Sequence, residues 1–511
     1  MLTAVGLASH LLSFLYRVVM ARLAGAQVLG LYQLIMPAYA VMQSLSIAGL
    51  TVAVSVLTAE HQARRNETGV QQVLSTSLRG LFVVWLPILL TVLVCSDFIS
   101  TTLLGDSRTE LGLVLLLPVL LLTGLENLQK QHFYALGRMA LPAGVELGEQ
   151  LVRCISIIAL LAVLLPQQEG IAAALIVAGL LISEVFSSSL LTWQRRRRGK
   201  RQRPWAGQRL KSRELSRRIC RIALPVSITA LVGNLMGAAT SVLIPKLLVD
   251  YGFTPEGAME EFGVMLGMTL PLLMVPTCFI NALTLSLLPR LTQERELGQL
   301  SRFRQTGEKA MLSVSYVVLP LITLVAALGP ELGGLLFGDL RVGQHIVVLA
   351  VAVAAGCYRS VLVCMLNALG KQAQSAAISL FAGALELVLT AALVGRFGLG
   401  GFGVAMVVSE LVGAGLCLAL VWRSVGVAVD CFRCFTAPIL ASLLAGLLVN
   451  LVYRMGLDRG ISPLFGVCGG LCFGLALYLA AMLAQGIHPV GAVLGKSVAF
   501  FPGLGYHKLG E

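Results

Sequence analysis

Charged residues are scarce in this sequence. Only 12% of its 511 residues are charged, against about 25% in ordinary soluble domains. Apolar residues make up 57% of the chain, and the mean hydropathy is +0.87. Such a composition leaves most side chains facing lipid or other apolar helices. It therefore excludes a soluble enzyme, a disordered chain and a disulfide scaffold.

Motifs of catalysis and of metal or cofactor binding are missing as well. The one CxxC pair, Cys431 and Cys434, has no second pair and no nearby histidine cluster, so it does not indicate a metal or redox site. A GxGxxG pattern at 398–403 joins two apolar stretches with no strand before it, which argues against a dinucleotide site. We therefore expect a protein that is not an enzyme and has no catalytic residue, metal or cofactor. Transport by such a protein would draw on an ion gradient, the membrane potential or the substrate gradient.

Long apolar runs fill most of the chain instead. A membrane helix needs roughly 20 apolar residues, and fourteen such runs can be placed. The sequence therefore predicts an all-α polytopic membrane protein with about fourteen transmembrane helices. The predicted spans are 2–22, 29–57, 74–96, 110–132, 142–165, 169–193, 222–249, 262–288, 310–330, 344–368, 375–395, 400–422, 434–453 and 463–485.

Basic residues are concentrated in alternate connectors. With the N-terminus in the cytoplasm, the connectors after even-numbered spans and the C-terminal tail hold 26 lysines and arginines, and the opposite connectors hold five. The connector 194–221 alone has 13 basic residues and one acid. By the positive-inside rule we expect a multi-pass membrane protein with both termini in the cytoplasm. We interpret the basic connector as a contact for anionic lipid headgroups and not for nucleic acid.

The two halves of the chain share a repeated pattern. The stretch Ala135–Ala140 recurs in similar form as Ala368–Ala373, 233 residues later, and Ser183-Glu184 has a counterpart in Ser409-Glu410. The repeat predicts two six-helix lobes, related by a pseudo-two-fold axis along the membrane normal, with a substrate site between them. The expected parts are an N-lobe at 1–193, a basic cytoplasmic linker at 194–221, a C-lobe at 222–424, two extra C-terminal helices at 425–486 and a cytoplasmic tail at 487–511.

The first predicted span carries unusual polar residues. His10, Ser13 and Arg17 share one helical face, and Arg22 follows near the outer end of the span. A charge at the centre of a span costs on the order of 2.5–3.5 kcal/mol on insertion scales, so it needs a partner, water or a function. Because Arg17 has no acid nearby in the sequence, the pattern favours a functional role for it.

Further polar residues lie inside other spans. Spacing of i, i+4 predicts acid–base pairs between Glu126 and Lys130 and between Glu149 and Arg153, which serve either helix packing or a cavity. The residues expected to line a cavity are His10, Ser13, Gln33, Glu126, Glu146, Glu149, Arg153, Asn234, Asn281 and Arg359. Those that either bind a coupling ion or help helices to pack are Glu184, Glu386 and Glu410.

The sequence resembles a known family. It is similar to the stage V sporulation protein B family, within the polysaccharide transport branch of the multidrug/oligosaccharidyl-lipid/polysaccharide exporter superfamily. The resemblance covers the chain end to end, with spans in a 6+6+2 arrangement. The stretches that carry it are Leu15–Gly25, Gly30–Leu34 with Pro37, Leu45–Ser55 running into Thr58–Glu60, Glu149–Arg153 and Ala368–Lys371.

The resemblance implies a flippase-like secondary transporter of the bacterial cytoplasmic membrane that works by alternating access. Members are associated with undecaprenyl-pyrophosphate-linked saccharides such as the peptidoglycan precursor lipid II, and the stage V branch with the spore cortex. In related lipid II flippases, cavity arginines are thought to engage the pyrophosphate, and Arg17 and Arg22 match that pattern. A guanidinium group pairs bidentately with phosphate oxygens. The implied partners are the lipid-linked saccharide, membrane lipids and cell-wall synthesis proteins, and we expect a monomer.

Two other functions stay open. A cation-coupled multidrug antiporter of the same fold would depend on acids such as Glu184, Glu386 or Glu410, although the arginines of the first span would repel a cationic substrate. A non-transporting membrane scaffold for cell-wall assembly would not depend on Arg17. The sequence departs from the family in two places: it starts almost inside the first span, without the short basic segment that usually precedes it, and Arg359 has no assigned role.

Overall fold

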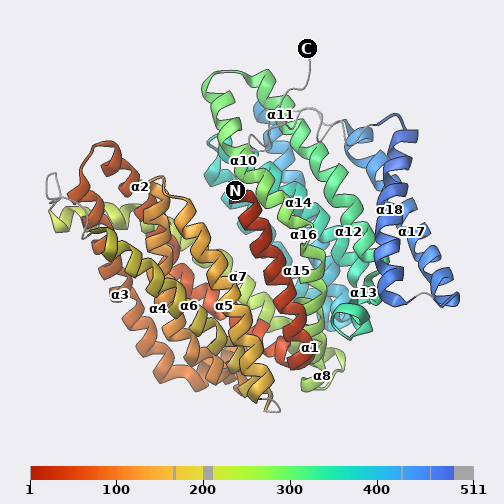
Figure 1. The fold of residues 1–511 in the computed structure, drawn as a ribbon, viewed down its shortest axis with the longest axis horizontal. Helices are drawn as coiled ribbons and strands as arrows, with labels where there is room; N and C mark the ends of the chain where they lie inside the picture. The colour runs from red at the N-terminus through yellow and green to blue at the C-terminus, as the bar shows by residue number, and fades with distance from the viewer. Residues whose placement is uncertain (1, 165–167, 200–210, 427–429, 461, 488–511) are drawn as a thin grey trace. The chain divides into compact units, whose positions relative to one another are not determined.

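The computed structural model describes residues 2–164, 168–199, 211–426, 430–460 and 462–487. Every regular element in this part of the chain is helical, which confirms the predicted all-α class (Figure 1). The α-helices are α1 (Leu2–Gln43), α2 (Gly49–Ala63), α3 (Glu67–Phe98), α4 (Glu110–Ala135), α5 (Ala140–Leu164), α6 (Glu169–Gly199), α7 (Ser212–Tyr251), α8 (Pro255–Phe262), α9 (Leu270–Met274), α10 (Thr277–Glu296), α11 (Leu300–Ser313), α12 (Leu319–Ala327), α13 (Gly329–Leu336), α14 (Ile346–Ala368), α15 (Gln372–Phe397), α16 (Leu399–Val425), α17 (Ala437–Asp458) and α18 (Pro463–Ala484). The tail beyond Ile487, with Lys496 and Lys508, and most of the basic connector, at 200–210, lie outside the described residues.

Twelve helical stretches of the described chain are long and apolar enough to cross a membrane. A thirteenth candidate runs from α8 through α9 into α10 and is bent between α9 and α10. The first stretch, Leu11–Ala63, has 53 residues. At about 1.5 Å per residue it is roughly 80 Å long, far more than the roughly 30 Å of a hydrocarbon core. Its helix is broken at Gly25, so it has room for two of the expected spans. The predicted count of fourteen is therefore approximate.

Gly25 interrupts α1 because its backbone adopts φ 81° and ψ 171°, a conformation that side-chain-bearing residues rarely adopt. The residues before and after it form two helical segments. Ser13 and Arg17 lie on the first segment, and Tyr32 and Gln33 lie on the second.

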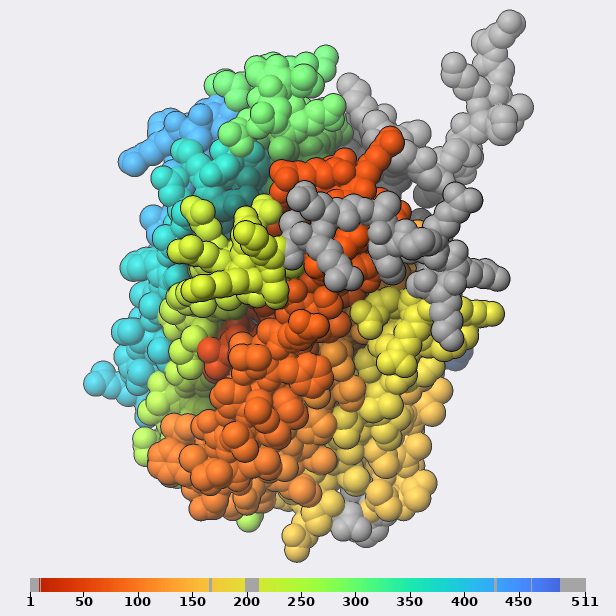
Figure 2. All heavy atoms as spheres, turned by 90° about the vertical axis from the view of Figure 1, so that its left-hand side faces the viewer, coloured from red at the N-terminus to blue at the C-terminus, as the bar shows by residue number. Residues whose placement is uncertain are grey.

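The outward face of α3 is strongly apolar. Phe82, Val83, Leu86, Leu90 and Val94 are all exposed. Figure 2 shows α3, in orange, covering much of the face that is turned toward the viewer. Large exposed apolar surfaces are unusual on soluble proteins, whereas acyl chains cover them in a membrane.

The chain divides into two compact units, one of residues 2–267 and the other from Met268 onward. Helix α7, which we expected to open the second lobe, packs against α1 and α2 within the first unit. The backbone N–H of Gly49 donates a hydrogen bond to the Ser227 hydroxyl at 3.2 Å. A Cβ atom at Gly49 would lie 2.1 Å from the carbonyl oxygen of Ala223, so only glycine permits this approach of α2 to α7. The compact units therefore meet between Gly267 and Met268 and not at the expected linker, 194–221. The lobe boundaries at 193 and 222 stay a prediction.

Each unit contains the same capped turn before a long helix. In the first unit, Gly105 has φ 82° and the Asp106 carboxylate accepts a hydrogen bond from the backbone N–H of Arg108 at 2.9 Å. In the second unit, Gly338 has φ 79°, and Asp339 accepts from Arg341 N–H at 2.9 Å. These positions are 233 residues apart, the same offset as the sequence repeat. The turn strengthens the evidence for an internal repeat.

We expect Gly49→Ala to destabilise the first unit by about 1–3 kcal/mol, because the added methyl group overpacks a backbone contact. The measurement is thermal unfolding of the purified protein in detergent. Gly144→Ala in α5 is the matched control, since a Cβ atom there meets no other atom within 4 Å. Equal stability losses in the two variants would contradict the close approach of α2 to α7.

Candidate functional site

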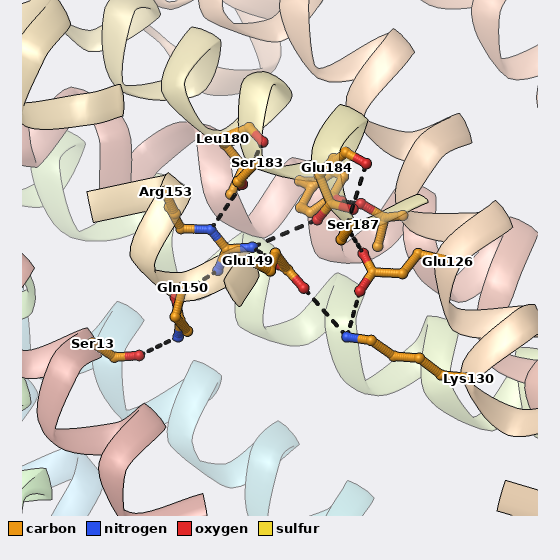
Figure 3. Close-up of polar contacts among 12 residues, drawn as sticks. Ser13, Glu126, Lys130, Glu149, Gln150, Arg153, Leu180, Ser183, Glu184 and Ser187 are labelled. Atoms are coloured by element: carbon orange, nitrogen blue, oxygen red, sulfur yellow. Dashed lines mark hydrogen bonds and ion pairs between the residues drawn. The ribbon is translucent and has the colours of Figure 1, made fainter. Parts of the chain in front are cut away.

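Five charged side chains gather among three helices of the first unit (Figure 3). Helices α4 and α5 both pack against α6, and their i, i+4 spacing turns the charges of each helix to one side. We call this group the first-unit cluster; its members are Glu126 and Lys130 of α4, Glu149 and Arg153 of α5, and Glu184 of α6.

Both predicted i, i+4 pairs are confirmed. Lys130 Nζ lies 2.5 Å from Glu126 Oε1, and the Arg153 guanidinium pairs with Glu149 Oε1. The structure also joins the two pairs, because Lys130 Nζ lies 3.3 Å from Glu149 Oε2. Arg153 Nη2 lies 3.6 Å from Glu184 Oε1, which brings α6 into the same network.

Hydroxyl and amide groups complete the cluster. The Ser187 hydroxyl donates to Glu126 Oε2 at 2.7 Å, and Arg153 Nε donates to the Ser183 hydroxyl at 3.3 Å. Gln150 is joined to Arg153 at 3.4 Å and donates to the Ser13 hydroxyl of α1. The cluster is therefore connected by hydrogen bonds to the helix that carries Arg17.

Arg17 differs from the charges of the cluster. Its side chain is half-buried, and no carboxylate of the described residues forms an ion pair with it. Arg17 and Arg153 both lie close enough to the phenol of Tyr32 to act on it electrostatically. Arg22 is exposed, and the side chain of His10 lies outside the described part of the structure.

The other residues expected to line a cavity take no part in the hydrogen bonds and ion pairs that join the described side chains of the cluster, although Glu146 lies near enough to Lys130 to act on it electrostatically. The Gln33 amide donates to the carbonyl of Leu266 at 3.1 Å, and the Asn234 amide donates to the carbonyl of Ala40 at 3.1 Å. These bonds tie neighbouring segments of the first unit together. Glu146 is exposed on α5, and so is Asn281 on α10.

The second unit has a smaller polar group, which we call the second-unit cluster: Arg359 of α14, Glu386 of α15, and Ser409 and Glu410 of α16. The Arg359 guanidinium holds both oxygens of Glu410, at 2.6 and 2.8 Å. The Ser409 hydroxyl donates to Glu386 Oε2 at 3.3 Å. The structure thus shows that Glu410 is the partner of Arg359. Local sequence spacing did not indicate this pair, because the two residues lie on different helices.

Two residues of the first-unit cluster have counterparts of opposite charge in the second-unit cluster. At the 233-residue offset, Glu126 corresponds to Arg359, and Arg153 corresponds to Glu386. Ser183, paired with Ser409 by the sequence repeat, accepts from an arginine, whereas Ser409 donates to a glutamate. A hydroxyl group can do either. Comparing the charged residues of the two copies at this offset would have revealed the correspondence.

We expect Arg359→Ala to destabilise the second unit by about 1–3 kcal/mol, because it leaves the Glu410 carboxylate without its charged donors. Exchanging the charges in the double variant Arg359→Glu/Glu410→Arg should recover part of the loss. Thermal unfolding in detergent measures both effects. Arg396→Ala, which removes an exposed arginine of the same unit, is the control and should change stability little. A loss as large in this control would contradict a specific role for the pair.

Comparisons with known proteins agree with this architecture. The sequence profile of a family described as "Polysaccharide biosynthesis protein" matches residues 1–294. Stage V sporulation protein B of Bacillus subtilis (strain 168) is 25% identical over 316 residues, which are 61% of this chain. The match spans 60% of the length of that relative.

Solved structures share the fold. Lipid II flippase MurJ, in an inward-closed conformation, matches with a TM-score of 0.69 and 12% identity over 95% of this chain and 98% of that one. An inward-facing multidrug resistance transporter of the MATE family matches with a TM-score of 0.62 and 17% identity over 82% and 94%. A MOP superfamily transporter from Pyrococcus furiosus matches with a TM-score of 0.60 and 15% identity over 83% and 94%. At these identities the likeness concerns the fold alone.

Proposed function

The chain belongs to the polysaccharide biosynthesis protein family, and from this premise we propose that it moves a prenyl-pyrophosphate-linked saccharide across the cytoplasmic membrane by alternating access. A flippase of this kind is a secondary transporter and not an enzyme. It has to guide an anionic, strongly hydrated headgroup through the bilayer while the prenyl chain stays among lipids.

Arg17 is the observation that carries the proposal. It is a half-buried charge on an apolar helix, and no described carboxylate neutralises it. Intramembrane charges are rare and usually functional. A guanidinium group that is not paired with a carboxylate of the protein can donate two parallel hydrogen bonds to two phosphate oxygens. Arg22, further along the same helix and exposed, would supply a second donor to the pyrophosphate.

The relatives favour a cell-wall glycan as the headgroup. The fold is shared with a lipid II flippase, and the curated relative is a stage V sporulation protein. We therefore propose lipid II or a related glycan of the cell wall or spore cortex as the substrate. The distribution of basic residues supports an orientation with both termini in the cytoplasm.

A cation-coupled drug antiporter is the second candidate, because MATE transporters share the fold and both clusters contain buried or half-buried acids. Against it stands the charge of Arg17, which would repel a cationic drug. In each cluster, moreover, at least one carboxylate is already paired with a base of the protein.

We expect wild-type protein to rescue a bacterial strain depleted of its lipid II flippase and Arg17→Ala to fail at equal protein abundance, because the phosphate donor is lost. Arg17→Lys should rescue in part, since it keeps the charge without the bidentate fork. Growth after depletion, with membrane abundance measured by immunoblot, is the readout.

Arg79→Ala is the matched control, because Arg79 is an exposed arginine of the same unit. It should rescue as well as wild type. Rescue by Arg17→Ala would remove Arg17 from the mechanism and favour a scaffold. Drug resistance conferred by the wild type without rescue would instead favour the antiporter.

A further inference from the structure

The first-unit cluster contains one carboxylate more than its bases can balance. Glu126, Glu149 and Glu184 are 2%, 6% and 4% exposed. One carboxylate oxygen of each lies within 4.8 Å of one from each of the others. Lys130 and Arg153 are the bases in direct contact with them. Full ionisation would leave a net charge of −1 in a place with little water. Buried charges without compensation are avoided by taking up a proton or another cation.

The contacts identify the carboxyl that lacks compensation. Glu126 has Lys130 on one oxygen and the Ser187 hydroxyl on the other. Glu149 has Arg153 on one oxygen and Lys130 on the other. Glu184 has one base within ion-pair distance among the described residues, Arg153, which lies 3.6 Å from its Oε1. Another near neighbour is the like-charged Glu126 carboxyl group. The Oε2 of Glu184 is buried without a hydrogen-bond partner among the described residues, although the side chain points into the cluster (Figure 3).

We propose that the first-unit cluster is a proton-binding site and that Glu184 carries the proton in the conformation described here. The chemistry is a simple exchange: the O–H bond of the Glu184 carboxylic acid breaks, and the proton passes to water while the electron pair stays on the carboxylate. A proton fits better than a metal ion, because Lys130 and Arg153 already occupy the space between the carboxylates and would repel a multivalent cation.

The groups that face Glu184 come from three helices. Glu126 and Lys130 approach from α4, and Glu149 and Arg153 approach from α5. From α1, Tyr39 lies near Glu184. The Tyr39 hydroxyl is hydrogen-bonded to the Thr123 hydroxyl at 2.7 Å.

Tyr16 and Tyr32, also of α1, lie near Arg153. Neither side chain is a carboxylate or a basic group, so the charge balance of the cluster rests on the acids and bases already named.

Loss of the proton would change the attachment of Arg153. In the described conformation its guanidinium favours Glu149 and stands 3.6 Å from Glu184. An ionised Glu184 would attract it and weaken its contact with Gln150, which is hydrogen-bonded to Ser13 of α1. Since Arg17 follows Ser13 by one helical turn, protonation would be linked to the helix proposed to hold the pyrophosphate. This link rests on the proposed function, whereas proton binding does not.

The two bases of the cluster are less deeply buried than its acids. The side chains of Lys130 and Arg153 are 13% and 17% exposed. In the second unit, both oxygens of Glu410 accept hydrogen bonds from Arg359. Glu184 has no such pair of charged donors among the described residues, which makes Glu410 a useful comparison.

Infrared spectroscopy of the purified full-length protein in lipid nanodiscs tests proton binding without any substrate. Wild type should show the C=O band of a protonated carboxylic acid, shifted in heavy water and fading as the pH is raised. Glu184→Gln should lose this band. Glu146→Gln, which alters an exposed acid of α5, and Glu410→Gln should both keep it.

The absence of the band in wild type, or its persistence in Glu184→Gln, would overturn the proposal. Loss of the band on adding sodium chloride at constant pH would also overturn it, by showing that Na⁺ occupies the site. Should Glu184→Gln fail to accumulate, Glu184→Asp provides the test, since it keeps a carboxylic acid and should shift the band without abolishing it.

Proteoliposomes that contain a pH-sensitive dye test the link to transport. The substrate probe is a fluorescent undecaprenyl-pyrophosphate disaccharide. Wild type should move protons together with the probe, and Glu184→Gln should lose the proton signal. Probe movement without proton movement in wild type would overturn the coupling and leave the proposed function intact. No probe movement at all, with the infrared band present, would overturn the proposed function and leave the proton site standing.

Discussion

The need to compensate charge in an apolar environment organises both units. A charged side chain inside a span is costly unless another group neutralises it. Helices α4, α5 and α6 meet where Glu126, Glu149 and Glu184 share Lys130 and Arg153, and helices α14 and α16 meet where Arg359 holds Glu410. Apolar side chains can face either lipid or protein, whereas these charges have to face one another. They therefore fix how α4, α5 and α6 are turned toward one another, and likewise α14 and α16.

At two positions of this network the repeat keeps a charged residue and reverses its sign. Glu126 becomes Arg359 and Arg153 becomes Glu386, and both clusters retain a serine that contacts the exchanged residue. The copies still differ in burial: all three acids of the first-unit cluster are buried, whereas Glu386 and Glu410 are half-buried. An unbalanced charge is therefore more costly in the first unit.

Arg17 is notable against this background, because it lies on a membrane helix without a described carboxylate to balance it. Its helix is nevertheless joined to the first-unit cluster through Ser13 and Gln150. An anionic lipid headgroup would supply the missing negative charge. The proposed pyrophosphate contact and the proposed proton site thus follow from the same electrostatic requirement, met once by a substrate and once by a proton.

Much of this protein could be predicted from its sequence, because apolar runs of membrane length and i, i+4 spacing are local properties. The all-α class and the pairs Glu126–Lys130 and Glu149–Arg153 are confirmed, while the span count is approximate. Tertiary structure alone showed that α7 packs with the first unit. It also showed that Lys130 joins the two pairs, that Glu184 enters the same network and that Arg359 binds Glu410. These contacts join residues from separate helices, and sequence spacing does not specify how separate helices turn toward one another.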